Sequence, residues 1–380
     1  MLCHGPELAP GGPVPYNKSV GHHDVIIAGG GIIGLTLALE LRRRGATVLV
    51  VDRGEPGHEA SRAAGGMLVD SVMETPTALQ ALATASAHMY PEFTAELERQ
   101  SGVSVDLRDA GTILLLSHEQ LRLHPDLAVQ HPLPSPTDRI EPSLKANGSA
   151  TAYLSERSVD PRGLATAAYQ AAKHANVTFV KDAVTGVDLA NGRAQGVTTT
   201  AGLFNSAAVV NCAGAWAGQF GPHPFPTRPV KGQMLCLAAP RENLLRHVIR
   251  SPQVYLIPRS DGRILAGATV EEAGFDKQTV ATTIDRLHAA AALLVPELRH
   301  ARRLEAWAGL RPGTPDSLPI LGATATPGYF VATGHFRDGV LLAPITALVM
   351  ADVITGVRPT HDLTPFSPAR FAVGQPVSPI

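Results

Sequence analysis

Residues 24–52 read DVIIAGGGIIGLTLALELRRRGATVLVVD, and this stretch decides the fold. An apolar run over residues 24–28 leads into a glycine-rich turn, and an amphipathic segment continues to about residue 44. A second apolar run over residues 47–51 ends in Asp52. Short continuous apolar runs bounded by glycine are typical of strands that are buried on both faces. The stretch therefore predicts a strand, a helix and a second strand, the βαβ unit of an α/β protein.

The glycines of the turn, Gly29, Gly31 and Gly34, have the spacing G-x-G-x-x-G between the predicted strand and helix. In dinucleotide-binding units the first glycine permits the tight turn, and the second lets the backbone approach a pyrophosphate. The third lets the helix and the strand pack closely. The start of the helix, at Ile32 and Ile33, would offer free N–H groups and a partial positive charge to phosphates.

Asp52 follows the second strand about 20 residues after the turn, where an acidic residue accepts hydrogen bonds from an adenosine ribose. Arg53 is next to it. These features predict a dinucleotide site, and the alternative is a structural glycine turn in another α/β protein. They do not separate FAD from NAD.

Residues 60–68, ASRAAGGML, form a run of mostly small residues after the second strand. Small side chains let a backbone lie against a large flat ligand and donate N–H groups to it, although the same composition also suits a close helix contact. The candidate ligand-contacting residues here are Ala60, Ser61, Gly65, Gly66 and Met67.

The rest of the chain mixes helical and strand-like patterns. Helices are predicted over residues 77–100, 162–174, 279–294 and 339–354, and strands over residues 112–116, 177–180 and, as a set, 233–268. Residues 118–142 are Pro-rich and poorly patterned. Residues 1–22 are predicted to be a disordered N-terminal extension and the Pro-rich residues 359–380 a C-terminal tail.

Composition argues against several classes of protein. The formal net charge of −1 gives no electrostatic footprint for nucleic acid or an anionic membrane. No apolar stretch is long enough to span a bilayer, and no apolar core of a signal peptide is found, so a cytoplasmic protein is expected. Cys3, Cys212 and Cys236 make no disulfide framework and match no zinc spacing, so no metal site is predicted.

Four segments together resemble the glycine oxidase branch of the FAD-dependent D-amino-acid oxidase family. Residues 61–68 resemble its flavin-contacting segment, and residues 254–259 with 262–269 resemble its paired substrate-domain strands. Residues 307–316 (WAGLRPGTPD) are similar to its substrate-arginine loop, and residues 334–344 (GHFRDGVLLAP) to its C-terminal flavin motif. The segments stand in the family order.

The resemblance implies an α/β fold in which a Rossmann-like FAD-binding domain is interrupted by an α+β substrate domain with an antiparallel sheet. The FAD-binding domain would comprise residues 23–75, 150–225 and 300–358, and the substrate domain residues 76–149 and 226–299. The chain has no cysteine in a family attachment motif, so the FAD is expected to be non-covalent. A homodimer or a homotetramer is left open.

The resemblance also assigns residues to roles. Arg311 would clamp the substrate carboxylate through two parallel charge-assisted hydrogen bonds, Arg337 would be the second arginine near the substrate, and Tyr255 would offer its hydroxyl. Val184 and Gly214 match cofactor-contacting positions. The segment expected to line the flavin consists of His335, Phe336, Arg337, Asp338, Gly339, Val340 and Leu341, ahead of a helix whose N-terminal field stabilises negative charge on the reduced ring.

The implied reaction is hydride transfer from Cα of a neutral-amine amino acid to flavin N5, without a dedicated general base. Oxygen would reoxidise the flavin to give peroxide, and the imine would hydrolyse to an oxo acid and ammonia or feed thiazole synthesis for thiamine. Val270 stands where the family pattern has methionine, so sarcosine, D-alanine or D-proline compete with glycine as substrate. A quinone-linked dehydrogenase, a non-catalytic flavoprotein and a nicotinamide enzyme are the alternatives.

Overall fold

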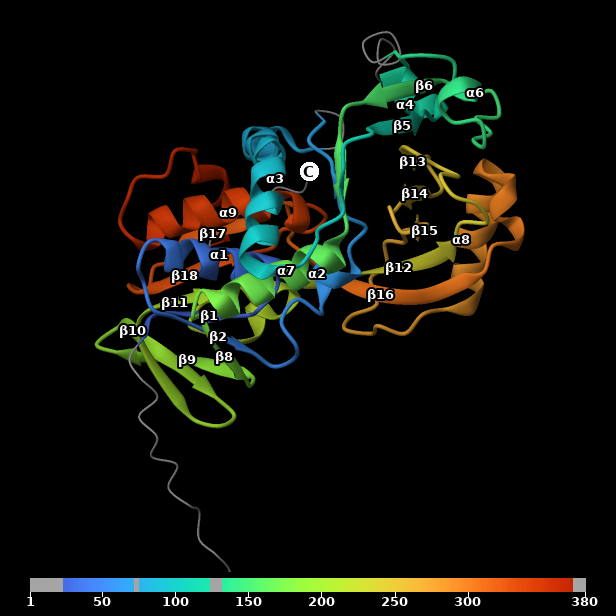
Figure 1. The fold of residues 1–380 in the computed structure, drawn as a ribbon. Helices are drawn as coiled ribbons and strands as arrows, with labels where there is room; N and C mark the ends of the chain where they lie inside the picture. The colour runs from blue at the N-terminus through green and yellow to red at the C-terminus, as the bar shows by residue number, and fades with distance from the viewer. Residues whose placement is uncertain (1–22, 72–74, 124–131, 372–380) are drawn as a thin grey trace, which may run out of the picture.

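The structure, a computed structural model, describes residues 23–71, 75–123 and 132–371. The predicted disordered extension, residues 1–22, lies outside the described residues. Figure 1 shows two lobes, each built on its own large sheet, with the chain crossing between them several times.

The first lobe contains an eight-stranded sheet with the order β17-β18-β11-β1-β2-β8, and β9 and β10 continue from β11 at one side. Strand β1 pairs in parallel with both β2 and β11, as the predicted βαβ unit requires. The strands are β1 (His23–Ala28), β2 (Val48–Asp52), β8 (Thr178–Lys181), β9 (Val184–Ala190), β10 (Arg193–Thr199), β11 (Leu203–Asn211), β17 (Ile320–Ala323) and β18 (Tyr329–Thr333).

Four helices cover this sheet on one side (Figure 1). They are α1 (Ile32–Arg43), α3 (Gln80–Ser101), α7 (Pro161–His174) and α9 (Gly339–Ile354). Ile27 and Val50 from the sheet, Leu37 and Leu41 from α1, and Leu342 from α9 are fully buried in one core. Burial of this apolar surface is the main force that holds the helices against the sheet.

Helix α9 contains a proline, and neighbouring side chains compensate for it. Pro344 has no N–H, so the carbonyl of Val340, four residues earlier, lacks an intrahelical donor. The hydroxyl group of Tyr90 on α3 donates a hydrogen bond to that carbonyl, and the hydroxyl group of Ser86 donates to the carbonyl of Leu341 at 2.6 Å. Helix α3 thereby fixes the first turn of α9, which lies at the functional site.

The second lobe contains a seven-stranded sheet with the order β16-β12-β15-β14-β13-β5-β6, in which all pairs except β5 with β13 are antiparallel. Helix α8 (Ala281–Leu294) packs against β12 and β15. The strands are β5 (Thr112–Leu115), β6 (Thr151–Leu154), β12 (Arg228–Ala238), β13 (Val248–Arg250), β14 (Tyr255–Pro258), β15 (Arg263–Gly267) and β16 (Arg303–Gly313).

The remaining elements of the described residues are short. A three-stranded sheet has the order β3-β7-β4. The elements are β3 (Met67–Leu68), β4 (Leu107–Arg108), β7 (Arg157–Val159), α2 (Ala60–Ala63), α4 (His118–Leu123), α6 (Thr137–Ile140), η1 (Thr77–Leu79), η2 (Gly214–Gln219), η3 (Pro296–His300), η4 (Thr364–Phe366) and η5 (Pro368–Phe371). The poorly patterned residues 118–142 therefore include two short helices.

The structure agrees with the four predicted helices and with the predicted pairing of the strands around residues 254–269, where Tyr255 lies opposite Gly267. The expected loop at residues 307–316 is wrong over residues 307–313, because these residues pair with β12 as the end of β16. Strands β6 and β16 also join the second sheet, although they fall inside ranges predicted for the FAD-binding domain. The division into domains otherwise stays a prediction.

The prediction of a C-terminal tail is wrong for residues 359–371, which pack on the first lobe. Phe366 is 1% exposed and belongs to the core of the first lobe. Arg370 forms an ion pair with Asp316, with 2.7 Å between Nε and the carboxylate. An aromatic ring and an ion pair, rather than any periodic pattern, order this segment, so the pattern alone gave no sign of it.

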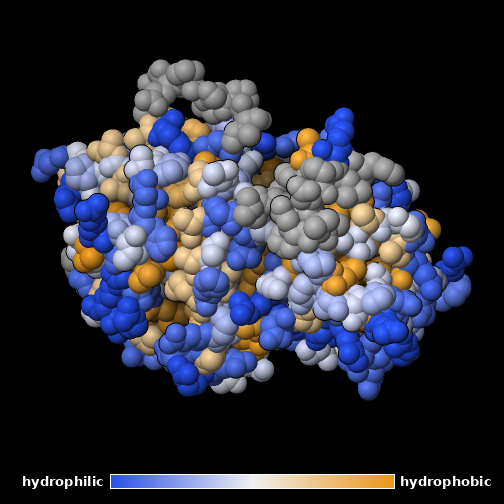
Figure 2. Space-filling model, turned by 90° about the horizontal axis from the view of Figure 1, so that it is seen from above, coloured by the Kyte–Doolittle hydropathy of each residue, from blue (hydrophilic) through white to orange (hydrophobic). Residues whose placement is uncertain are grey.

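Figure 2 shows one face of the molecule, with apolar side chains gathered in its inner part and hydrophilic side chains around the margin. Among the described residues, no helix is both long enough and apolar enough to cross a membrane.

Candidate functional site

A cavity of about 720 Å³ is lined by residues of both lobes. The predicted site residues that line it are Gly29, Gly31, Ile32, Ile33, Asp52, Arg53, Ala60, Ser61, Gly65, Gly66, Met67, Val184, Gly214, Tyr255, Arg311, His335, Phe336, Arg337, Asp338, Gly339 and Val340. The structure thus brings together residues from distant parts of the chain. Gly34 and Leu341 do not line the cavity.

The two exceptions are buried for different reasons. A Cβ atom at Gly34 would lie 2.0 Å from the carbonyl oxygen of Gly29, so this glycine allows the close approach of helix and turn. Leu341 is 1% exposed and packs in the core, so its predicted flavin contact is not supported by its position. Its neighbour Val340, one residue earlier on α9, lies at the cavity wall instead.

The glycine turn has a backbone that other residues would not adopt. Gly29 has a φ of +111°, and a Cβ atom there would lie 2.5 Å from the carbonyl oxygen of Cys212. The first amide of α1, at Ile32, donates to the hydroxyl group of Ser61 at 2.8 Å. The N–H groups of Gly31 and Ile33 have no acceptor among the described residues, so they are free to bind phosphate.

Asp52 joins the turn to the end of β2. One carboxylate oxygen accepts from the N–H of Gly30 at 2.7 Å, and the other accepts from the N–H of Gly54 at 2.8 Å. A carboxylate has about four acceptor positions, so Asp52 keeps capacity for a ribose hydroxyl. Its position at the cavity wall fits the role predicted for it.

Trp216 is a cavity residue that sequence reasoning missed. The guanidinium group of Arg53 lies 3.9 Å from the centre of its ring, and the ring of Phe275 stacks on it with centres 5.2 Å apart. Trp216 follows Gly214 in η2, on the loop after β11. The sequence did carry one signal for this residue, because Trp216 stands two positions after Gly214, which was predicted to contact the cofactor.

The segment of small residues lies between the cavity and the second sheet. A Cβ atom at Gly65 would lie 2.9 Å from Cδ1 of Ile257 on β14. Gly66 has a φ of +79°, and a Cβ atom there would lie 2.0 Å from the carbonyl oxygen of Val159. Gly66 therefore excludes any other residue, whereas a side chain at Gly65 would require the end of the Ile257 side chain to move. Both glycines line the cavity.

Arg311 is held by backbone carbonyls and not by a carboxylate. Its Nη1 donates to the carbonyl of Thr269 at 3.0 Å and to that of Lys231 at 3.3 Å. It makes no ion pair with a carboxylate in the described part of the chain. Burial lowers the pKa of Arg311, and the nearby charge of Arg337 acts in the same direction. The charge of Glu271 opposes this shift without forming an ion pair. A half-buried guanidinium group that no described carboxylate contacts is suited to binding an anion from the cavity.

Tyr255 and Arg337 complete this end of the cavity. The Tyr255 hydroxyl lies 3.2 Å from the sulfur of Met234, and burial raises the pKa of this tyrosine, so it stays a neutral hydrogen-bond donor. Arg337 is exposed and its guanidinium group lies 5.3 Å from the centre of the Phe336 ring. Two guanidinium groups and a hydroxyl therefore face one side of the cavity.

Gly232 supports Arg311 and was missed in the sequence. A Cβ atom at Gly232 would lie 2.3 Å from Nη1 of Arg311, so the guanidinium group lies directly over the backbone of β12. A glycine within a strand often marks such a close approach. That signal was present in the run Val230-Lys231-Gly232-Gln233-Met234.

His335 and the start of α9 form the remaining wall. Burial lowers the pKa of His335 to about 3, so the ring is neutral, and its Nε2 lies 3.1 Å from the hydroxyl group of Thr346. Gly339 and Val340, in the first turn of α9, face the cavity. The positive end of the helix dipole is therefore directed at the cavity.

Comparison with protein families gives one match across most of the chain. The model of the DAO family, described as FAD dependent oxidoreductase, matches residues 24–353. The chain belongs to this family.

The cofactor of the family is FAD, and the residues of the cavity fit it. Free amides at the start of α1, glycines whose Cβ atoms would collide with backbone, and an acidic residue at the end of β2 are the features that a dinucleotide needs. The predicted fold class and the predicted FAD cofactor are thereby confirmed. The roles of individual site residues stay predictions.

Individual relatives of the family agree in sequence and structure. A protein named glycine oxidase from Geobacillus kaustophilus is 33% identical over 365 residues, covering 92% of this chain and 97% of its own length. The crystal structure of glycine oxidase from Geobacillus kaustophilus matches with a TM-score of 0.84 and 32% identity, covering 92% of this chain and 99% of that one. The predicted resemblance is confirmed.

A longer relative is a bifunctional protein named ThiO/ThiG from Trichormus variabilis, 34% identical over 362 residues. The match covers 92% of this chain and 55% of the relative, so this chain spans about half the length of that protein.

Proposed function

We propose that this chain oxidises glycine or another small amino acid at its FAD, with oxygen as the electron acceptor. The observation that carries the proposal is Arg311, a half-buried cation that two backbone carbonyls hold in place and that forms no ion pair with a described carboxylate. An amino-acid substrate brings the missing carboxylate. The names of full-length relatives, glycine oxidases, support this choice.

The cavity residues would divide the work as follows. Arg311 and the hydroxyl group of Tyr255 bind the substrate carboxylate, and Arg337 adds positive charge nearby. Binding of the carboxylate by Arg311 and Tyr255 would orient the substrate Cα toward the backbone of Gly65 and Gly66, against which the flavin ring of FAD would lie. Bound FAD supplies the two-electron acceptor, and the protein contributes position and polarity. The amine must be neutral, and no residue is needed as a dedicated base.

The identity of the side chain that the pocket accepts depends on Val270. This residue lines the cavity and is 54% exposed, at the position where the family pattern has methionine. A shorter side chain at the mouth leaves more room beside Cα. We therefore include sarcosine, D-alanine and D-proline with glycine as substrates to be tested. The imine product would hydrolyse or serve thiazole synthesis for thiamine. The homo-oligomer and the cytoplasmic location stay predictions from the sequence.

The test is anaerobic mixing of the purified yellow protein with each of the four amino acids while the flavin absorbance is recorded, followed by readmission of air. Bleaching by one of them, with recovery and peroxide in air, is the expected result. FAD-loaded protein that none of the four bleaches contradicts the proposed substrate class. Bleaching that a quinone reverses and air does not reverse contradicts oxygen as the acceptor and favours a quinone-linked dehydrogenase.

A variant pair separates substrate binding from general damage. Arg311→Gln is expected to lower kcat/KM by about 10–100-fold, because hydrogen bonds to a charged group contribute about 1.5–3 kcal/mol. Arg303→Gln is the matched control, since Arg303 lies at the other end of β16 and pairs with Asp285 at 2.7 Å. An Arg311→Gln protein with the kcat/KM of the control would show that the carboxylate binds elsewhere.

A further inference from the structure

Arg259 is a buried arginine whose side chain points at the back of the small-residue segment. It follows β14, and its N–H bonds the carbonyl of Arg263 at 2.8 Å to close the turn into β15. The residue is only 3% exposed. Its Nη2 donates a hydrogen bond to the carbonyl oxygen of Gly65, 194 positions away in the sequence.

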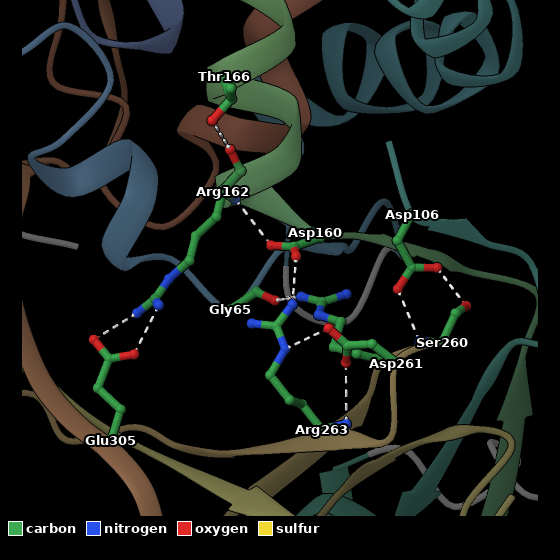
Figure 3. A network of polar contacts seen from close by, with 10 residues as sticks. Gly65, Asp106, Asp160, Arg162, Thr166, Ser260, Asp261, Arg263 and Glu305 are labelled. Carbon is green, nitrogen blue, oxygen red and sulfur yellow. Dashed lines mark hydrogen bonds and ion pairs between the residues drawn. The ribbon is translucent and has the colours of Figure 1, made fainter. Parts of the chain in front are cut away.

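The rest of this guanidinium group is not paired. Among the described residues, Nε and Nη1 of Arg259 have no hydrogen-bond partner. The nearby carboxylates are committed elsewhere (Figure 3): Asp160 pairs with Arg263 at 2.8 Å, and Asp106 accepts from the N–H of Ser260 at 3.0 Å and from its hydroxyl group. Among the described residues, the guanidinium group of Arg259 therefore has one hydrogen-bond acceptor, the carbonyl oxygen of Gly65.

Burial lowers the pKa of this guanidinium group, but not enough to remove its proton at neutral pH. Burial lowers the pKa of Arg259 to about 10, while the carboxylates of Asp160 and Asp106 oppose the shift. Arg259 therefore stays protonated near neutral pH. Desolvating a guanidinium group costs free energy that one hydrogen bond does not offset, so a purely structural role explains this arrangement poorly.

The geometry of the peptide bond links Arg259 to the cavity. In a trans peptide the C=O and the following N–H point in opposite directions. Because the carbonyl of Gly65 points at Arg259, the N–H of Gly66 points away from it. Gly65 and Gly66 both line the cavity, and the Gly66 N–H has no acceptor in the described part of the chain. This N–H is therefore available to a ligand in the cavity.

We propose that Arg259 is a positioning residue for the flavin. It fixes the Gly65–Gly66 peptide so that the Gly66 N–H donates to the ring, and its charge, transmitted through that one peptide, stabilises the electron-rich reduced ring. A charge-assisted hydrogen bond at the carbonyl strengthens the N–H at the other end of the same peptide. This inference rests on the proposed contact of Gly65 and Gly66 with FAD, and not on the identity of the amine substrate.

The experiment compares FAD-loaded wild-type protein with Arg259→Gln and Arg259→Lys at neutral pH. Sulfite serves as the probe, because it adds reversibly to oxidised flavins, bleaches them and leaves negative charge on the ring. The sulfite dissociation constant and the two-electron reduction potential are measured, along with the FAD content. None of these readings requires turnover of an amino acid, so failure of the proposed substrate class leaves them interpretable.

Arg259→Gln is expected to weaken sulfite binding about tenfold, the size of one lost charge-assisted hydrogen bond. A tenfold fall in the equilibrium constant for two-electron reduction corresponds to a potential lower by about 30 mV. Arg259→Lys keeps a charge and a donor, so it is expected to stay within about threefold of wild type. The proposal is also supported if the Arg259→Gln protein loses its FAD and the Arg259→Lys protein retains it.

Arg108→Met is the matched control. Arg108 belongs to the same network, where its Nη1 donates to the hydroxyl group of Ser260 at 3.0 Å. Its Nη2 donates to the carbonyl of Arg246, and neither hydrogen bond goes to residues 60–68. Its loss removes a nearby positive charge without touching the Gly65 carbonyl. The proposal is overturned if Arg259→Gln binds sulfite as tightly as wild type, if Arg108→Met changes sulfite binding as much, or if Arg259→Lys loses as much as Arg259→Gln.

Discussion

Arg311 lies over the backbone of Gly232, at a distance where a Cβ atom on that glycine would be 2.3 Å from Nη1 and 2.4 Å from Nη2. The contact joins two neighbouring strands, β12 and β16, at the wall of the cavity. A glycine without a side chain is thus part of the anion site, although it offers no functional group of its own.

Gly232→Ala is expected to raise the KM for the amino acid by about 10–100-fold, the effect of misplacing a binding group by about 1 Å. The fold should survive, because the atoms displaced are the flexible end of a long side chain. Steady-state kinetics and FAD content check this. Gly163→Ala is the control, since its Cβ atom would lie 3.4 Å from the nearest atom and KM should not change. An unchanged KM in Gly232→Ala would contradict the arrangement.

Tyr90 replaces the hydrogen bond that Pro344 removes from α9. Tyr90→Phe leaves the buried Val340 carbonyl without a donor and is expected to lower the free energy of unfolding by about 1–3 kcal/mol. Pro344→Ala restores a backbone N–H that can donate to the same carbonyl. In that background the cost of Tyr90→Phe should fall below about 1 kcal/mol, and a double-mutant cycle by urea unfolding measures the difference. Equal costs in both backgrounds would contradict this account.

His335 makes stability depend on pH in a defined direction. Its pKa in the folded protein is about 3, whereas an exposed histidine titrates near 6.5. Between these values the unfolded chain binds more protons than the folded chain, so stability falls as pH decreases below about 6.5. The slope from this residue is about 1.4 kcal/mol per pH unit. Above about pH 6.5 the ring is neutral in both states, and this residue adds no further dependence of stability on pH.

Urea unfolding of the FAD-loaded protein at pH 7, 6 and 5 measures the slope. His335→Gln should remove this part of the pH dependence, and His300→Gln, at an exposed position, should leave it in place. If wild type and His335→Gln lose stability equally between pH 7 and pH 5, the ring of His335 is not buried in its neutral form.

Phe366 tests whether the residues after α9 stabilise the first lobe. The ring is 1% exposed, so Phe366→Ala is expected to lower the free energy of unfolding by about 3–5 kcal/mol. Leu293→Ala, at a position that is 67% exposed, should change it by less than about 0.5 kcal/mol. A stability change for Phe366→Ala as small as that of the control would contradict the packing of this ring in the core.

The βαβ unit and its glycine turn could be predicted because their determinants are local. Apolar runs, helical periodicity and the positions of Gly29, Gly31 and Gly34 lie within residues 24–52, and backbone conformation follows from neighbours in sequence. The resemblance to a known family then named Arg311, Tyr255 and Arg337. Local patterns also placed the helices of the second half of the chain correctly.

The tertiary structure alone decided which distant residues meet. Arg259 contacts Gly65 across 194 positions, and Trp307 donates to the carbonyl of Ala63 across 244. Residues 307–313, where a loop was expected, form a strand because they pair with β12, and this pairing places Arg311 over Gly232. Sequence determined the local conformations because they depend on short-range sterics and periodicity. The cavity and the placing of Arg311 and Arg259 beside it depend on chain crossings that bring separate segments together, and no local pattern specifies those contacts.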